Sequence, residues 1–145
     1  MGASDPASPR RDRAGPLSGA TLVAFAGTTD LDRAHAFYGD VLGLERTEAS
    51  TFANAYAVGG GGLRVTLVDT VTAAPYTLLG WRVDDLAAAM AILSEAGVSF
   101  ERFPGLDQDA AGVWTAPGGT RVAWFPDPDG NRLSVSQAPP EEASP

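Results

Sequence analysis

The chain has 145 residues, of which 44% are hydrophobic and 19% are charged, and this size and composition fit one globular domain with its own core. No apolar run approaches the ~20 residues of a membrane-spanning helix, and no continuous apolar segment near Met1 suggests a signal peptide. The formal net charge of −8 opposes contact with nucleic-acid phosphates. Neither a nucleic acid nor a membrane is therefore expected as a partner, and the protein is expected in the cytoplasm.

The two ends of the chain are rich in proline, alanine and serine, a composition typical of disorder. Residues 1–18 and 139–145 are therefore predicted to be disordered tails, and residues 19–138 to be a single folded domain.

The first half of this domain, residues 19–69, is predicted to combine one helix with several strands. Asp30 is a favourable N-cap, apolar residues recur after it at helical spacing, and Gly43 ends the pattern. The glycines at 59–62 predict a turn between two strands. The predicted elements are a strand at 21–27, a helix from 30 to 41, and strands at 44–49, 53–58 and 63–69.

The second half, residues 76–138, repeats this order. Asp84 or Asp85 caps a helix that Gly97 ends, and the residues at 127–131 predict a tight turn between the last two strands. The acidic loop at 104–112 has no counterpart in the first half, and it either closes over a pocket or is a simple insertion. The predicted elements are a strand at 76–83, a helix to 96, a strand at 98–103, a short extended piece at 113–116, and strands at 120–125 and 132–137.

The two halves read as a duplicated unit. Asp30 and Asp85 are 55 residues apart, and Gly43 and Gly97 are 54 residues apart. A nearly constant offset over two element boundaries is typical of an internal repeat. Each unit reads βαβββ, and two such units place their first and last strands around one shared cleft.

The chain carries few reactive side chains. It has no cysteine, and all ten of its basic residues are arginine. Thiolate chemistry and Schiff-base chemistry are therefore excluded. The one histidine, His35, is expected at the edge of the first helix. The absence of lysine also suggests a GC-rich bacterial source.

Two motifs carry a resemblance to a known family. Residues 30–44 read Asp-Leu-Asp-Arg-Ala-His-Ala-Phe-Tyr-Gly-Asp-Val-Leu-Gly-Leu, and residues 124–133 read Trp-Phe-Pro-Asp-Pro-Asp-Gly-Asn-Arg-Leu. Over roughly residues 20–137 the chain resembles the vicinal oxygen chelate superfamily, which includes glyoxalase I, extradiol dioxygenases, fosfomycin-resistance enzymes and bleomycin-binding proteins. The resemblance implies an α+β fold in which two βαβββ modules form a curved mixed sheet around a cleft, commonly as a homodimer.

The resemblance also implies where a divalent metal would be held. Members with a metal typically carry a histidine seven residues before the Asp of each Asp-Leu pair, where this chain has Val23 and Leu78. They carry a glutamate in the last strand, where this chain has Ser134, and a further ligand near Arg64 or Thr66. Because a bound cation needs several converging donors, we expect no metal and no other cofactor.

The cleft is predicted by counting along the strands in steps of two, since alternate side chains share a face. Trp81 falls on the opposite face and is expected to pack against the second helix. An aromatic and aliphatic lining with guanidinium groups suits a planar or partly apolar ligand whose carbonyl or carboxylate meets an arginine. The predicted pocket residues are Val23, Phe25, Tyr56, Arg64, Thr66, Leu78, Gly80, Arg82, Trp114, Trp124, Ser134 and Ser136.

The leading hypothesis is a metal-free protein that binds a small organic ligand, with sequestration and resistance as one use. One alternative is a metal-independent lyase, isomerase or cyclase, whose acid or base would be Tyr56, Asp69 or His35. Another is a metal-dependent enzyme of the glyoxalase or dioxygenase type with atypical ligands. A structural role is favoured if side chains fill the cleft.

Overall fold

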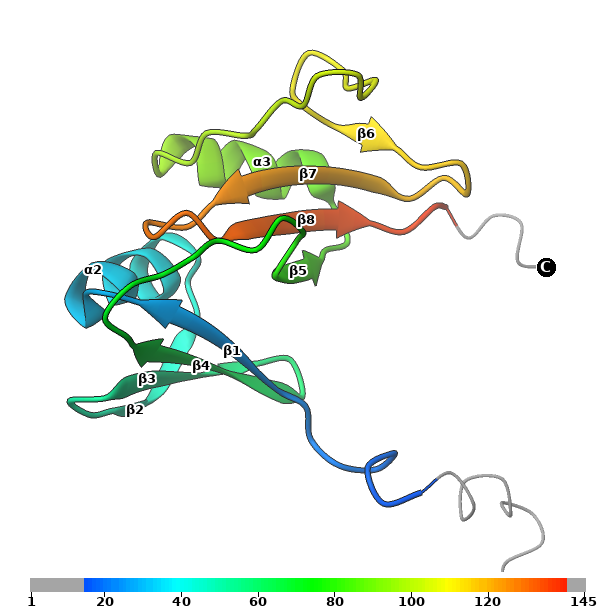
Figure 1. Cartoon of the computed structure of the whole chain (residues 1–145). Coiled ribbons are helices and arrows are strands. Elements are labelled where there is room, and N and C mark those ends of the chain that lie inside the picture. The colour runs from blue at the N-terminus through cyan, green and yellow to red at the C-terminus, as the bar shows by residue number, and fades with distance from the viewer. Residues whose placement is uncertain (1–14, 141–145) are drawn as a thin grey trace, which may run out of the picture.

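The computed structural model describes residues 15–140 as two βαβββ modules (Figure 1). The order of elements confirms the duplication predicted from the sequence. In chain order the elements are β1 (Val23–Thr28), α2 (Leu31–His35), η1 (Ala36–Val41), β2 (Glu45–Ala49), β3 (Ala53–Val58), β4 (Gly61–Leu67), β5 (Leu79–Arg82), α3 (Leu86–Glu95), β6 (Trp114–Thr115), β7 (Arg121–Pro126) and β8 (Arg132–Gln137).

Each module forms its own four-stranded mixed sheet. The strand order is β1-β4-β3-β2 in the first sheet and β5-β8-β7-β6 in the second. In each sheet the first strand of the module pairs in parallel with the last, and the other pairs are antiparallel. The α+β class is confirmed, with two separate sheets in place of the one curved sheet that the resemblance implied. Figure 1 shows the two sheets as distinct layers.

Each sheet has one face covered by helix and one uncovered face. In β1, Ala26 and Thr28 are buried whereas Phe25 is 59% exposed, which is the alternation expected of a strand with one packed face. We call the covered side the inner face and the other side the open face. The buried core lies on the inner faces and consists of Ala26, Ala34, Tyr38, Tyr56, Leu63, Val65, Leu86, Met90, Val113, Ala123, Phe125, Leu133 and Val135.

The two predicted helix caps are confirmed. The carboxylate of Asp30 accepts a hydrogen bond from the backbone N–H of Arg33, and that of Asp85 accepts one from Ala88. The first helix widens into the π-helical segment η1, where the N–H of Leu42 bonds to the carbonyl of Phe37.

The strand predicted at 98–103 is wrong, because this segment has no strand conformation. The backbone N–H of Glu101 bonds to the carbonyl of Trp124 on β7. The side-chain amide of Gln108, and not a neighbouring strand, bonds to the carbonyl of Glu101 and the N–H of Phe103. The Gln108 side chain accepts from the N–H of Phe103 and donates to the carbonyls of Glu101 and Gly112. The loop at 104–112 is thereby tied to the segment before it.

The ends of the described chain carry little regular structure. Residues 15–18, predicted as part of a tail, form a turn, and residues 138–140 have no regular structure. The rest of the predicted tails, 1–14 and 141–145, lies outside the described residues. Within 15–140, none of the helices combines the length and apolar character needed to cross a membrane.

The turn at 127–131 joins β7 to β8, as predicted, and also holds the two modules together. Tyr38 of η1 donates a hydrogen bond of 2.6 Å to Asp127, and both side chains are buried. Asn131 donates to Asp127 at 2.8 Å and to the carbonyl of Gly27 in β1 at 3.2 Å. A turn of the second module therefore supplies acceptors and donors that complete the first.

Asp129 in the same turn forms the second part of this junction. Its carboxylate accepts from the hydroxyl of Thr28 at 2.6 Å and from the N–H and hydroxyl of Thr29, and it pairs with Arg33 at 2.6 Å. Burial by itself raises the pKa of Asp129, but the hydrogen bonds from Thr28 and Thr29 and the charge of Arg33 outweigh burial and hold the pKa below its ordinary value. The ionised form is therefore the one that joins the modules.

Candidate ligand-binding site

The register of the second sheet brings six of the predicted pocket residues onto its open face. Gly80 pairs with Ser134, which pairs with Trp124 on the other side. Two residues further along β5, Arg82 pairs with Ser136. Ser136 also pairs with Val122, which in turn pairs with Trp114. Because directly paired residues share a face, the group on this face comprises Gly80, Arg82, Trp114, Trp124, Ser134 and Ser136.

The open face of the first sheet carries four more of them. Phe25 of β1 pairs with Arg64 of β4, and Val23 and Thr66 follow at spacings of two on the same strands. Arg64 pairs with Glu48 of β2 at 3.4 Å. This face therefore presents exposed apolar side chains next to a neutralised ion pair.

The open face of the first sheet continues into the segment that links the modules. Phe25, Thr66 and Leu78 line one hollow of about 510 Å³, together with Tyr76 and other residues of the segment 68–76. The hollow contains none of the six residues on the open face of the second sheet, and the two sheets do not pair with each other.

Tyr56 lies on neither open face, although the sequence predicted it as a pocket residue. In β3 it pairs with Leu63, whereas its neighbour Ala55 pairs with Arg64, so Tyr56 points to the inner face. It is 1% exposed, and its hydroxyl lies 2.9 Å from Nδ1 of His35. The prediction failed because the alternation of β3 depends on its register with β4, which the short run of residues does not reveal.

The same arrangement bears on the metal-independent enzyme hypothesis. His35 and Tyr56 were two of the three candidate acids or bases, and they are hydrogen-bonded to each other under the first sheet. Their rings are stacked with centroids 5.8 Å apart. Neither side chain is therefore available to a ligand on the open face.

The residues at the implied metal positions do not form a donor set for a divalent cation. Val23 and Leu78 have no lone pair to offer, Arg64 is cationic, and Ser134 and Thr66 supply only neutral hydroxyls. Among residues 15–140, no group of three or more His, Cys, Asp or Glu side chains could hold a metal ion.

Sequence reasoning missed three side chains that lie beside Trp124. Phe103 meets Trp124 edge-on with ring centroids 5.5 Å apart, and the guanidinium carbon of Arg132 lies 4.7 Å from the centroid of Phe103. Thr77 accepts a hydrogen bond of 3.0 Å from the Trp124 indole N–H. The spacing of two between Arg132 and Ser134 was the available signal for Arg132, whereas the placement of Phe103 depends on a loop.

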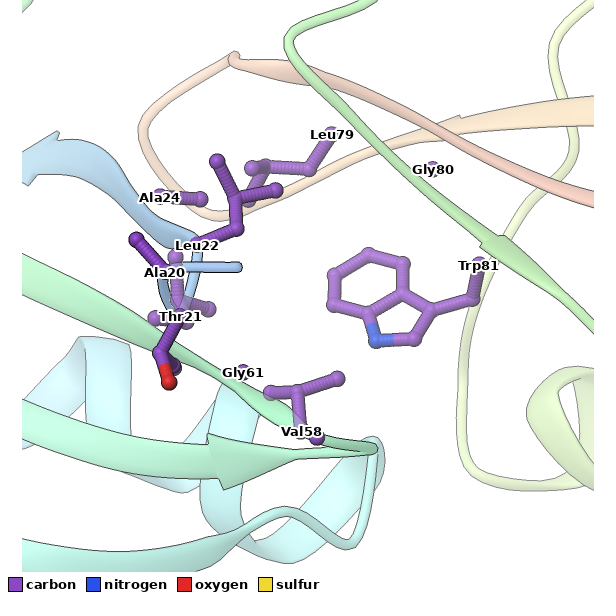
Figure 2. A pocket seen from close by; sticks show the side chains of 12 residues that line it. Ala20, Thr21, Leu22, Ala24, Val58, Gly61, Leu79, Gly80 and Trp81 are labelled. Carbon is purple, nitrogen blue, oxygen red and sulfur yellow. The ribbon is translucent and has the colours of Figure 1, made fainter. Parts of the chain in front are cut away.

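A separate apolar hollow lies on the inner faces, where the modules meet (Figure 2). It measures about 340 Å³, and Figure 2 shows the indole of Trp81 pointing into it towards Val58 and Gly61. Trp81 also borders a neighbouring hollow of about 250 Å³ that Ala89 and other residues of α3 line. Trp81 is thus on the side of the second helix, as predicted.

The comparisons with known proteins agree with this architecture. A family model described as Glyoxalase/Bleomycin resistance protein/Dioxygenase superfamily matches residues 22–135. None of the curated proteins compared with the chain matches it in sequence.

Among solved structures, the chain is similar to a glyoxalase family protein from Bacillus anthracis, with 16% identity, a TM-score of 0.65, and coverage of 81% of this chain and 93% of that one. It is similar to a glyoxalase/bleomycin resistance protein/dioxygenase from Alicyclobacillus acidocaldarius, with 19% identity, a TM-score of 0.64 and coverage of 83% and 92%. It is also similar to a lactoylglutathione lyase from Agrobacterium tumefaciens, with 19% identity, a TM-score of 0.61 and coverage of 82% and 93%. These likenesses show the fold, and the family model, which spans most of the chain, shows that the chain belongs to the glyoxalase/bleomycin resistance protein/dioxygenase superfamily.

Proposed function

We propose that this protein binds a small organic ligand, aromatic or partly apolar, on the open faces of its two sheets without the help of a metal ion. The observation that carries the proposal is the lining of that surface. Val23, Leu78 and Ser134 stand where the resemblance implies metal ligands, and Trp124 is the register partner of Ser134. Sequestration of a harmful compound is the biological use that such binding would serve.

The proposal includes a homodimer. β1 is an edge strand of its sheet and exposes Val23 and Phe25, and Leu22 is exposed just before it. β5 is an edge strand of the other sheet. Burying one large apolar side chain stabilises an interface by about 1.5–3 kcal/mol, and contiguous exposed apolar side chains are typical of association surfaces. A second copy covering this edge would also enclose the hollow beside Phe25.

The test is a thermal-shift assay of chelator-treated protein, with divalent metals in one series and planar aromatic compounds in the other. A ligand that binds only the folded state raises the melting temperature by mass action. We expect a rise with organic compounds that is unchanged by added chelator. A rise with Mn²⁺, Ni²⁺ or Zn²⁺ and with no organic compound would contradict the proposal and favour the metal-dependent enzyme.

A further inference from the structure

The open face of the second sheet carries a fixed aromatic cluster. Trp124 lies at its centre, with Phe103 edge-on at 5.5 Å and Trp114 tilted at 6.1 Å between ring centroids. The hydrogen bond from the Trp124 indole to Thr77 fixes the orientation of the ring. A flat apolar group can therefore stack at this position without first ordering the side chains.

Beside Trp124 the neighbouring strands carry only small side chains, Ser134 and Gly80, and we call this flat area the floor. Ser134 is the register partner of Trp124, and Gly80 is the next partner across the sheet. The Ser134 hydroxyl leans over Gly80 so closely that a Cβ added there would lie 2.6 Å from Oγ. Small side chains at both positions let a planar ring approach the sheet against the wall that Trp124 forms.

One end of this floor carries a positioned cation. The Arg132 guanidinium stacks on Phe103 with 4.7 Å between its carbon and the ring centroid, and its Nε lies 3.5 Å from Glu101. Its Nε atom is buried, yet 34% of the side chain is exposed. Within residues 15–140 the two terminal nitrogens of Arg132 make no hydrogen bond, so their N–H groups are free to donate hydrogen bonds to a ligand.

A second guanidinium adds positive charge to the same face. Arg82 lies two residues beyond Gly80 on β5, opposite Ser136, and its side chain has no ion-pair partner in the described part of the chain. Glu101 is the carboxylate that faces Arg132, and it contacts the Nε side of the fork. This face is therefore locally cationic, although the chain has a net charge of −8.

We propose that the ligand of this surface is a planar aromatic carboxylate, whose ring stacks beside Trp124 and whose carboxylate accepts two hydrogen bonds from the terminal nitrogens of Arg132. A planar fork matches a planar carboxylate in a bidentate pair. Arg132 is then a specificity-determining residue. The inference rests on the proposed function, because it names the class of ligand for the same open face.

Isothermal titration calorimetry with two matched probes tests the inference. The probes are 2-naphthoate and its neutral amide, 2-naphthamide, which share a ring and differ in charge. A hydrogen bond to a charged group contributes about 1.5–3 kcal/mol, so we expect the wild-type protein to bind 2-naphthoate about tenfold or more tightly than 2-naphthamide. The variant Arg132→Gln should lose this preference while its affinity for 2-naphthamide stays the same.

The matched control is Arg46→Gln, which removes the same charge from the inner side of β2, where Arg46 pairs with Tyr56. Its preference for 2-naphthoate should equal that of the wild type. Equal affinity of the wild type for both probes would overturn the inference and leave the proposed function standing, and this comparison needs no variant to fold. A lack of binding of either naphthalene, with no thermal shift from any aromatic compound, would overturn the proposed function as well.

Discussion

The hydrogen bond between Tyr38 and Asp127 provides the sharpest test of how the two modules are joined. It spans 89 positions in the sequence, measures 2.6 Å and is buried. Burial and the neighbouring Asp127 carboxylate raise the pKa of Tyr38, so its hydroxyl stays protonated and continues to donate at alkaline pH. Replacing Tyr38 with phenylalanine removes the donor and leaves the packing of the ring in place.

The expected magnitude follows from the groups involved. A buried hydrogen bond to a charged group contributes about 1.5–3 kcal/mol, and removing one partner leaves the other insufficiently solvated. Asp127 keeps its hydrogen bond from Asn131 at 2.8 Å on the same oxygen. Tyr38→Phe should therefore lower the free energy of unfolding by about 2 kcal/mol, which corresponds to a fall of about 7 °C in Tm for a domain of this size.

Urea denaturation at pH 7 measures this loss, with the slope m expected to stay the same because the exposed area barely changes. The control is Tyr76→Phe, since Tyr76 is exposed on the linking segment, and its stability should change by less than about 0.5 kcal/mol. If Tyr38→Phe were as stable as the wild type, the junction described above would contribute nothing measurable and the reasoning would be refuted.

Three further changes have defined outcomes. The pKa of Asp129 is lower in the folded state than in the unfolded chain. Its contribution to the free energy of unfolding is therefore complete above the pKa of the unfolded chain, about 4, and is lost as the pH falls through the pKa of the folded state. In the Asp129→Asn variant the free energy of unfolding should accordingly fall less steeply as the pH is lowered, as measured by urea titrations at several pH values between about 5 and 2. Phe25→Asp places a charge on the exposed edge and should convert a dimer to a monomer in light scattering; an unchanged mass would contradict the dimer surface. Gly80→Val fills the floor next to Ser134, so the protein should keep its circular dichroism spectrum and lose affinity for 2-naphthoate, whereas unchanged affinity would place the ligand elsewhere.

Local signals were sufficient to predict most of the elements. Asp30 and Asp85 cap helices because a carboxylate at that position accepts free backbone N–H groups, whatever lies farther along the chain. The alternation of β8 likewise follows from the strand itself, which buries Leu133 and Val135 and leaves Ser134 on the other face. The family resemblance rested on motifs of this local kind.

The failures arose where a partner segment decides the outcome. The segment at 98–103 has the composition of a strand, but Gln108 satisfies backbone groups that a neighbouring strand would have bonded. Tyr56 was assigned to the pocket, although the register with Leu63 turns it to the inner face. Neither hydrogen bond nor register can be read from a short stretch of sequence.

The sequence by itself determined that two βαβββ modules form, because capping and alternation are properties of neighbouring positions. Only the tertiary structure decided that Phe103 and Arg132 stack beside Trp124 and that Asp127 joins the modules through Tyr38. These contacts join side chains from distant parts of the chain, and their geometry exists only once both modules have packed.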